Sequence, residues 1–213
     1  MSRTRGAKAA DHEARRAALL AAMHDRLVAP DLAPPSLREL AAAAEVTLPT
    51  LAHHFGKRED IVAALIEELG RQGAPYLAEA AATALPFAES VAALLALIVD
   101  GLTHGGVAAL HVLGLREGLR QGRIGPTYVA AILEPTLAAA EARLATHIAR
   151  GEMIAADPRH AAIALVSPLL VAALHQQELG GADVRCLDLA ALARDQGAAF
   201  VRAYRTVADE RSI

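Results

Sequence analysis

The sequence has a single cysteine, Cys186, among its 213 residues. One cysteine cannot form a disulfide within the chain and lacks a CxxC partner for zinc, so the pattern favours a reducing, cytoplasmic environment. We expect Cys186 to be buried as a small hydrophobic residue. No run of about eighteen apolar residues free of charge and proline occurs, which disfavours a membrane span. The basic N-terminus leads into a charged segment rather than an apolar one, so we expect no export signal.

Motifs of common catalytic and metal-binding sites are also missing. The chain has no GxSxG, no Walker phosphate loop, no HExxH and no CxxC, so nothing in it predicts an enzyme or a bound cofactor. His53 and His54 are adjacent, but neighbouring residues on a helix point about 100° apart and no third ligand lies nearby in the sequence. We therefore expect no metal site.

The net formal charge is only −3, which argues against a general binder of polyanions. Its distribution is uneven, because residues 1–30 carry a net charge of +3 and the remaining 183 residues carry −6. A basic segment on an acidic body suits a protein that touches phosphate only at one end. A solvated, frayed terminus explains the same charges equally well. Charge alone does not decide between the two.

Helical periodicity is what the sequence has in abundance. Apolar residues recur at intervals of three and four almost everywhere, and alternating strand-like runs are missing, so we predict an all-α protein. Helices are expected at residues 11–28, 37–44, 48–54, 58–70, 86–103, 105–120, 126–150, 158–178 and 187–207. Asp157 followed by Pro158 is a specific start signal. Pro135 and Pro168 fall inside helical patterns and should kink them.

Two of the expected helices, 37–44 and 48–54, are unusually short. Isolated helices below about 12 residues are marginal in water, so these two must hold one another. Ser36 and Glu39 have the spacing of a capping box, and Thr47 can cap the second helix. A shared apolar seam is available from Leu40, Ala41, Ala44, Val46 and Leu51. This is the pattern of a helix-turn-helix, whose second helix can enter the major groove of DNA.

The stretch from Leu37 to Ile61 resembles the DNA-binding signature of TetR/AcrR-type repressors. Val46-Thr47, Thr50-Leu51, His53 and the run Phe55-Gly-Lys-Arg-Glu-Asp-Ile61 stand where the family pattern expects them. The close resemblance covers residues 15–65. It implies an N-terminal three-helix helix-turn-helix DNA-binding domain at residues 1–60 and a C-terminal helical domain for ligand binding and dimerisation at residues 61–213.

Three departures from the family pattern qualify the resemblance. Glu45 occupies a turn position usually given to glycine, which costs about 1 kcal/mol if its φ is positive. Ala52 and His54 replace residues that are commonly tyrosine in the family, so contacts to phosphate or bases are lost there. Leu48 stands where a polar residue is common, which suggests an apolar contact to a thymine methyl group.

The resemblance implies a transcriptional regulator, a repressor in the simplest case, that binds palindromic double-stranded operator DNA as a homodimer and has no membrane partner. The predicted DNA-binding residues are Ser36, Thr47, Leu48, Pro49, Thr50, His53, His54 and Lys57. Lys57 follows the recognition helix and is expected to clamp a phosphate. An all-α ligand carrier or enzyme that retains a vestigial helix-turn-helix is the alternative from another class.

Release from DNA is expected when a small, largely apolar effector binds, because residues 86–178 hold many aliphatic and few aromatic or charged side chains. The candidate pocket residues are Ile98, Val99, Leu102, His104, His111, Leu113, Arg116, Tyr128 and Ile132. Core histidines that touch no ligand fit as well, and Arg116, Glu117 and Arg120 also fit an intrahelical ion pair.

Helical stripes near the C-terminus suit either an intramolecular core or a dimer interface. The resemblance favours a four-helix dimer interface with two helices from each subunit. The candidate interface residues are Leu165, Leu169, Ala172, Ala173, Leu189, Leu192, Gln196, Ala199 and Ala203.

Overall fold

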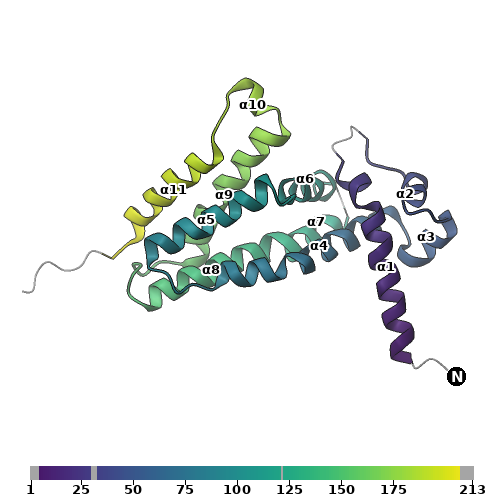
Figure 1. Cartoon of the computed structure of the whole chain (residues 1–213), viewed down its shortest axis with the longest axis horizontal. Helices are drawn as coiled ribbons and strands as arrows, with labels where there is room; N and C mark the ends of the chain where they lie inside the picture. The colour runs from purple at the N-terminus through teal and green to yellow at the C-terminus, as the bar shows by residue number, and fades with distance from the viewer. Residues whose placement is uncertain (1–4, 30–32, 121, 207–213) are drawn as a thin grey trace, which may run out of the picture. The chain divides into compact units, whose positions relative to one another are not determined.

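The computed structural model describes residues 5–29, 33–120 and 122–206 (Figure 1). Within these residues every regular element is a helix, apart from one isolated bridge between Met153 and Arg205. The all-α prediction is confirmed. The chain divides into two compact units, Met1–Gln72 with Ala109–Ile132 and Gly73–Ala108 with Leu133–Ile213. The boundary that we expected at residue 60 therefore falls inside the first unit, because residues 109–132 return to it.

The first unit is built around the beginning of α4. It contains α1 (Arg5–Val28), α2 (Leu37–Ala43), α3 (Leu48–Phe55), the first part of α4 (Arg58–Ala81), most of α6 (Val107–Gly118), α7 (Ile124–Tyr128) and the π-helical turn Val129–Leu133. On α1, Leu19, Met23 and Leu27 recur at helical spacing and are buried, whereas on α4 the whole run 61–66 is buried. A helix that is apolar all round must be covered all round, so the first turns of α4 are the centre of this unit.

The second unit is a set of long helices packed around one core. It contains the end of α4, α5 (Phe87–Thr103), α8 (Glu134–Ala149), α9 (Pro158–Ala173) with the π-helical turn Leu174–Glu178, α10 (Gly181–Val184) and α11 (Leu189–Tyr204). Helix α5 lies against α11 and α9, and α8 lies against α9 (Figure 1). Asp157 and Asp188 cap the starts of α9 and α11 with their carboxylates, as the Asp157-Pro158 signal predicted for α9.

Several expected helices have different limits in the structure. Helix α4 runs past Pro75 to Ala81, eleven residues beyond the predicted end. The expected helix 126–150 is broken into α7, a π-helical turn and α8, with Pro135 in the first turn of α8. Proline has no N–H to continue the ladder, which explains a change of hydrogen-bond register just before it. Helix α9 continues past Pro168. Cys186 is exposed, so the expectation that it is buried was wrong.

A buried arginine joins three helices of the second unit. The side chain of Arg143 on α8 donates from Nε to the carbonyl of Ala80 (2.5 Å) and from its terminal nitrogens to the carbonyls of Glu79 (3.0 Å) and Ala82 (2.8 Å). It also donates to the carbonyl and hydroxyl oxygens of Ser90, each at 3.1 Å. Burial lowers the pKa of Arg143. The guanidinium thereby caps the C-terminal end of α4, where backbone carbonyls lack helical partners.

One described helix, Pro158–Glu178, is long and apolar enough to cross a membrane, and α5 with α6 passes the same test as a bent pair. Length and composition alone carry little weight, because core helices of soluble proteins meet the same criterion. Leu165 and Leu169 of α9 are fully buried in the core of the second unit. One face of α9 is therefore part of this core, while Ile163 and Val171 are exposed on the helix.

Candidate nucleic-acid interface

Helix α2 begins with the capping box that the sequence predicts. The backbone N–H of Ser36 donates to the Glu39 carboxylate (2.7 Å), and the N–H of Glu39 donates to the Ser36 hydroxyl (3.3 Å). Arg26 of α1 also donates to Glu39 (2.8 Å). The backbone bond from Ser36 and the bond from Arg26 lower the pKa of Glu39 to about 2. Ser36 and Glu39 therefore fix the entry to the two short helices and tie it to α1.

The turn between α2 and α3 is closed at Glu45. Its φ is 52°, and within the described residues it is the non-glycine residue with a positive φ. The adjacent Val46 donates its N–H to the carbonyl of Ala41 (3.0 Å), which brings the chain back towards α2. The positive φ on which the expected cost depends is therefore present.

Replacing Glu45 with glycine should therefore stabilise the protein. Glycine adopts positive φ without a steric penalty but loses more entropy on folding, so the net gain is expected to be about 0.5 kcal/mol. Urea unfolding followed by circular dichroism measures it. Glu45→Ala is the control, because it removes the same carboxylate while keeping the Cβ atom. Equal midpoints for the two variants would show that the backbone at this turn is not strained.

Helix α3 presents two distinct faces. Thr47 caps it, accepting from the N–H of Thr50 (3.3 Å), and the two threonine hydroxyls lie 2.8 Å apart. Leu51 and Phe55 are buried against the unit. Leu48, Pro49, Ala52 and His53 are exposed, and Thr50 and His54 are half-buried. Most of the predicted DNA-binding residues therefore lie on the outer face or at the start of this helix.

His54 differs from the other predicted contacts. It is half-buried, and its Nδ1 atom is buried without a hydrogen-bond partner. Its ring lies 5.3 Å from that of His12, and its carbonyl accepts from Arg16, whose guanidinium also lies over the Phe55 ring. Burial and then the charges of His12 and His53 lower the pKa of His54. We infer that His54 holds α3 against α1, while His53 faces outward.

The two cations after α3 have different surroundings. Gly56 ends the helix with a φ of 85°, and Lys57 follows with an exposed side chain and an N–H bonded to Asp60 (3.1 Å). Arg58 instead turns inward, donating to the carbonyl of Pro35 (2.6 Å) and to Glu117. Arg58 and Glu117 are 59 positions apart, so the sequence alone did not predict that Glu117 belongs to this site.

The candidate pocket residues are divided between the two units. Ile98, Val99, Leu102 and His104 belong to the second unit, and His111, Leu113, Arg116, Tyr128 and Ile132 belong to the first. In the first unit His111 and Tyr128 are buried and bonded to each other (2.5 Å). Arg116 donates to the carbonyls of Leu27 and Ala29. These polar groups are thus engaged by the protein itself, and their role towards a ligand stays a prediction.

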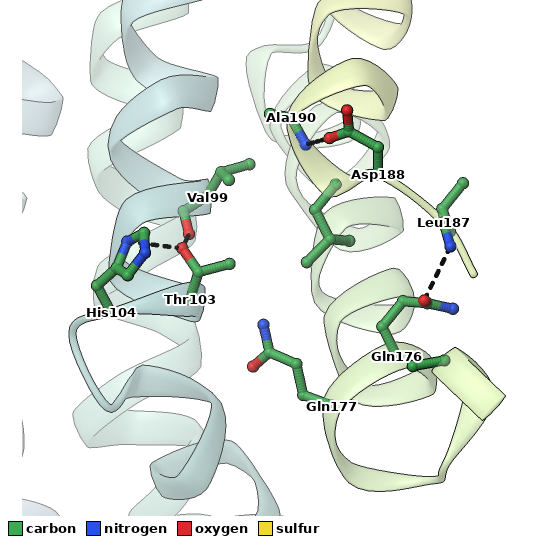
Figure 2. A pocket seen from close by; sticks show the side chains of 10 residues that line it. Val99, Thr103, His104, Gln176, Gln177, Leu187, Asp188 and Ala190 are labelled. Carbon is green, nitrogen blue, oxygen red and sulfur yellow. Dashed lines mark hydrogen bonds between the residues drawn. The ribbon is translucent and has the colours of Figure 1, made fainter.

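The second unit has an open groove with a volume of about 410 Å³. Its lining residues are Val99, Thr103, His104, Gln176, Gln177, Ala182, Leu187, Asp188, Leu189 and Ala190. Figure 2 shows the residues of α5 on one side of it and those around the start of α11 on the other, with Gln177 pointing into the space. His104 is exposed and bonds to Asp100 (3.0 Å) and Thr103 (3.1 Å). Of the predicted pocket residues, Val99 and His104 are the two that line this groove.

The predicted dimer-interface residues differ in their burial. Five of its residues are buried within the second unit's own core, namely Leu165, Leu169, Ala172, Ala173 and Leu189. These five side chains pack within their own chain, and their part in a dimer interface stays a prediction. Leu192 and Gln196 are half-buried, and Ala199 and Ala203 are exposed. The apolar residues that α9 exposes are Ile163 and Val171, at 38% and 65%.

Comparison with solved structures identifies the fold. A TetR transcription regulator from Haloarcula marismortui matches with a TM-score of 0.71 at 11% identity, covering 91% of this chain and 100% of the other. The Bacillus subtilis regulator FadR, solved with stearoyl-CoA, gives 0.67 at 19% identity, covering 87% and 97%. A TetR family regulator from Pseudomonas syringae gives 0.66 at 19% identity, covering 91% and 98%. No family model matches the sequence, and no curated protein matches it.

Fold and site together define an all-α helix-turn-helix protein with a second unit of long helices. This is the fold of the TetR-family transcriptional regulators, and it extends over nearly the whole chain.

Proposed function

We propose that the protein is a TetR-type transcriptional repressor that binds palindromic operator DNA as a homodimer and is released by a small, largely apolar effector. The observation that carries the proposal is the outer face of α3. A short helix, capped at Thr47 and anchored by Leu51 and Phe55, exposes Leu48 and Pro49 in its first turn and leaves Thr50 half-buried. That is the presentation that the second helix of a helix-turn-helix needs to reach base edges.

The side chains of α3 and of Lys57 directly after it offer both apolar and polar groups for contacts with DNA. Leu48 is 37% exposed and offers an apolar contact to a thymine methyl group. Thr50 and His53 supply hydroxyl and imidazole groups for base edges, while Lys57 supplies a charge for phosphate. Residues 1–60 would then read DNA, with residues 61–213 serving effector binding and dimerisation.

The exposed apolar surface of α9 supports a homodimer. Only 39% of the apolar stretch in helix Pro158–Glu178 is buried within the chain. Val171 of this helix is largely exposed. On α11, Ala199 and Ala203 are exposed and small enough to permit close helix packing. A second copy related by two-fold symmetry would cover the same surface on both chains.

The aliphatic character of the second unit supports a lipophilic effector. Its core and the residues packed against it are almost all Leu, Ile, Val and Ala, and FadR of the same fold was solved with stearoyl-CoA, which has a long acyl chain. An effector that binds more tightly to a conformation unable to match both half-sites would shift the population away from DNA.

Selection of bound duplexes from random-sequence DNA tests the proposal. Two-fold symmetric sequences should be enriched, with half-site centres about one to one and a half helical turns apart. Sedimentation of the complex should show two chains per duplex. Enrichment of asymmetric sequences by a monomer would contradict the dimeric reading, and no enrichment at all would contradict DNA binding.

Lys57→Ala is expected to weaken binding to all duplexes about equally and to reduce the slope of log affinity against log salt by about 0.9, because one phosphate contact is lost. His53→Ala is expected instead to change base preference at one position in each half-site, because base contacts carry specificity. Fluorescence anisotropy at several salt concentrations measures both. An unchanged salt slope for Lys57→Ala would show that its side chain does not contact phosphate.

A further inference from the structure

We propose that Glu117 and Arg116 of α6 are positioning residues for DNA reading, which hold the ends of α1, α2 and α4 in the geometry that α3 needs. This inference rests on the proposed DNA-binding function. It also assigns Arg58, which lies in the motif directly after the recognition helix, a place in this cluster rather than on a phosphate. The three residues are called the Glu117 cluster below.

Glu117 is the centre of the cluster. Its side chain is 2% exposed, and its two carboxylate oxygens accept from the two terminal nitrogens of Arg58 at 2.8 and 2.9 Å. The hydrogen bonds from Arg58 lower the pKa of Glu117, so the pair is ionised at neutral pH. A paired, forked contact of this kind fixes direction as well as distance. Removing one partner would leave the other charge buried and uncompensated.

Arg58 passes this restraint to the start of α2. Its Nε atom donates to the carbonyl of Pro35 at 2.6 Å, one residue before the Ser36 cap. The side chain is 23% exposed. Three of the five N–H groups of Arg58 are thus bonded within the protein, and these bonds hold its guanidinium towards Glu117 and Pro35.

Arg116 adds the end of α1 to the same cluster. It donates to the carbonyls of Leu27 (2.9 Å) and Ala29 (3.1 Å) at the C-terminus of that helix. A cation at a helix C-terminus is favoured by the helix dipole and satisfies carbonyls that have no helical partner. Its Nε atom is buried without a hydrogen-bond partner and lies 3.6 Å from Glu117. Adjacent residues of α6 therefore contact the end of α1 and the start of α4, and Arg58 extends these contacts to the start of α2.

The segment that carries the cluster is itself tightly packed. A Cβ atom on Gly118 would come within 3.0 Å of the backbone of Gly125, so α6 and α7 approach backbone to backbone. The N–H of Arg123 donates to Glu59 (2.8 Å), and its guanidinium bonds to Asp60 (2.9 Å) at the start of α4. These contacts explain why residues 109–132 cluster with the helix-turn-helix.

The expected consequence is a selective loss of base recognition. Base contacts need α3 to lie accurately in the groove, whereas exposed cations adapt to phosphates over a wider range of positions. Loosening α1, α2 and α4 should thus weaken binding to a selected duplex far more than binding to random-sequence DNA. A purely structural role for the cluster would lower thermal stability and leave both affinities of the folded protein unchanged.

The test uses the full chain and two probes, a duplex of about 30 base pairs selected by the wild-type protein and a random-sequence duplex of equal length. Glu117→Gln keeps the shape but breaks the paired contact, and Arg58→Gln removes the other partner. Each is expected to weaken binding to the selected duplex about tenfold or more, the effect of one lost base contact, with less than about twofold change on random DNA. The salt slope should stay that of the wild type. Arg185→Gln, which replaces an exposed arginine of the second unit, is the control and should leave both affinities unchanged.

Affinities are measured well below each variant's unfolding midpoint and corrected for the active fraction. If Glu117→Gln does not fold, Arg116→Gln decides, since it keeps the Glu117–Arg58 pair and loses only the bonds to α1. A reduced salt slope in Arg58→Gln, or unchanged selectivity in Glu117→Gln and Arg116→Gln, overturns the inference while DNA binding stands. Absence of wild-type binding to either duplex overturns the inference together with the proposed function.

Discussion

Arg143→Met is expected to lower the free energy of unfolding by about 3–5 kcal/mol, since the substitution leaves three carbonyls at the end of α4 without their buried donor. Glu79, Ala80 and Ala82 supply these carbonyls, and Ser90 on α5 loses the bonds to its carbonyl and hydroxyl oxygens. Natural domains are stable by about 5–15 kcal/mol, so this one side chain carries a large share. Denaturant unfolding followed by circular dichroism measures the loss.

Two further variants separate the causes. Arg143→Lys keeps the charge near the end of α4 but cannot reproduce the forked set of five bonds, so a loss of about half that of methionine is expected. Arg150→Met is the matched control, because Arg150 is exposed and also donates to carbonyls of the segment after α4, those of Thr83 (2.9 Å) and Leu85 (3.4 Å). Its effect should stay within about 0.5 kcal/mol. Similar losses for Arg143→Met and Arg150→Met would show that burial of the guanidinium is unimportant.

Local signals in the sequence predicted the starts of helices well. The Ser36–Glu39 box, the Thr47 cap and the Asp157-Pro158 start are each complete within four residues. Their hydrogen bonds depend on the chain nearby and on little else. The strained φ at Glu45 was predictable for the same reason, because it follows from the geometry of one tight turn.

Contacts between distant parts of the chain could not be predicted in this way. Glu117 was read as part of an intrahelical pair, yet its paired contact is with Arg58 on another helix. The sequence did not indicate that Arg143 is buried. An arginine within a helical pattern is usually exposed to solvent, and its burial follows only from the position of the end of α4, which the sequence does not give. A single sequence contains the side chain but not the position of its partners.

The surface that a second copy would cover could not be located from the sequence for a related reason. An apolar stripe identifies the face of a helix that is buried but not what buries it. On α9 the periodic stripe through Leu165 and Leu169 covers the core of its own unit, whereas the exposed Ile163 and Val171 lie outside that stripe.

The buried pair of His111 and Tyr128 leads to the second large effect. Their side chains are 6% and 3% exposed, and Nδ1 of His111 lies 2.5 Å from the Tyr128 hydroxyl. Burial lowers the pKa of His111 to about 4 and raises that of Tyr128 to about 12. Both groups are thus neutral in the folded protein at neutral pH.

Acid should therefore destabilise the protein through His111. The pKa of this histidine is about 6.5 in the unfolded chain and about 4 in the folded one. Between these two pH values His111 is therefore protonated in the unfolded state and neutral in the folded state. Stability is then greatest above pH 6.5 and falls as the pH drops towards 4, by about 3 kcal/mol from this group. His111→Gln keeps an acceptor for the Tyr128 hydroxyl but cannot titrate.

Free energies of unfolding are measured by denaturant titration for the wild type and His111→Gln at several pH values between 7 and 4. Carboxylates such as Glu39 contribute equally to the two proteins, so their contribution cancels when one free energy is subtracted from the other. The wild type is expected to lose about 3 kcal/mol relative to His111→Gln over that interval. His160→Gln, which replaces an exposed histidine of α9, should follow the wild type at every pH. Parallel curves of unfolding free energy against pH for His111→Gln and the wild type would contradict this prediction. They would mean that His111 binds a proton as readily in the folded protein as in the unfolded chain. Water or a negative charge would then have to reach the imidazole.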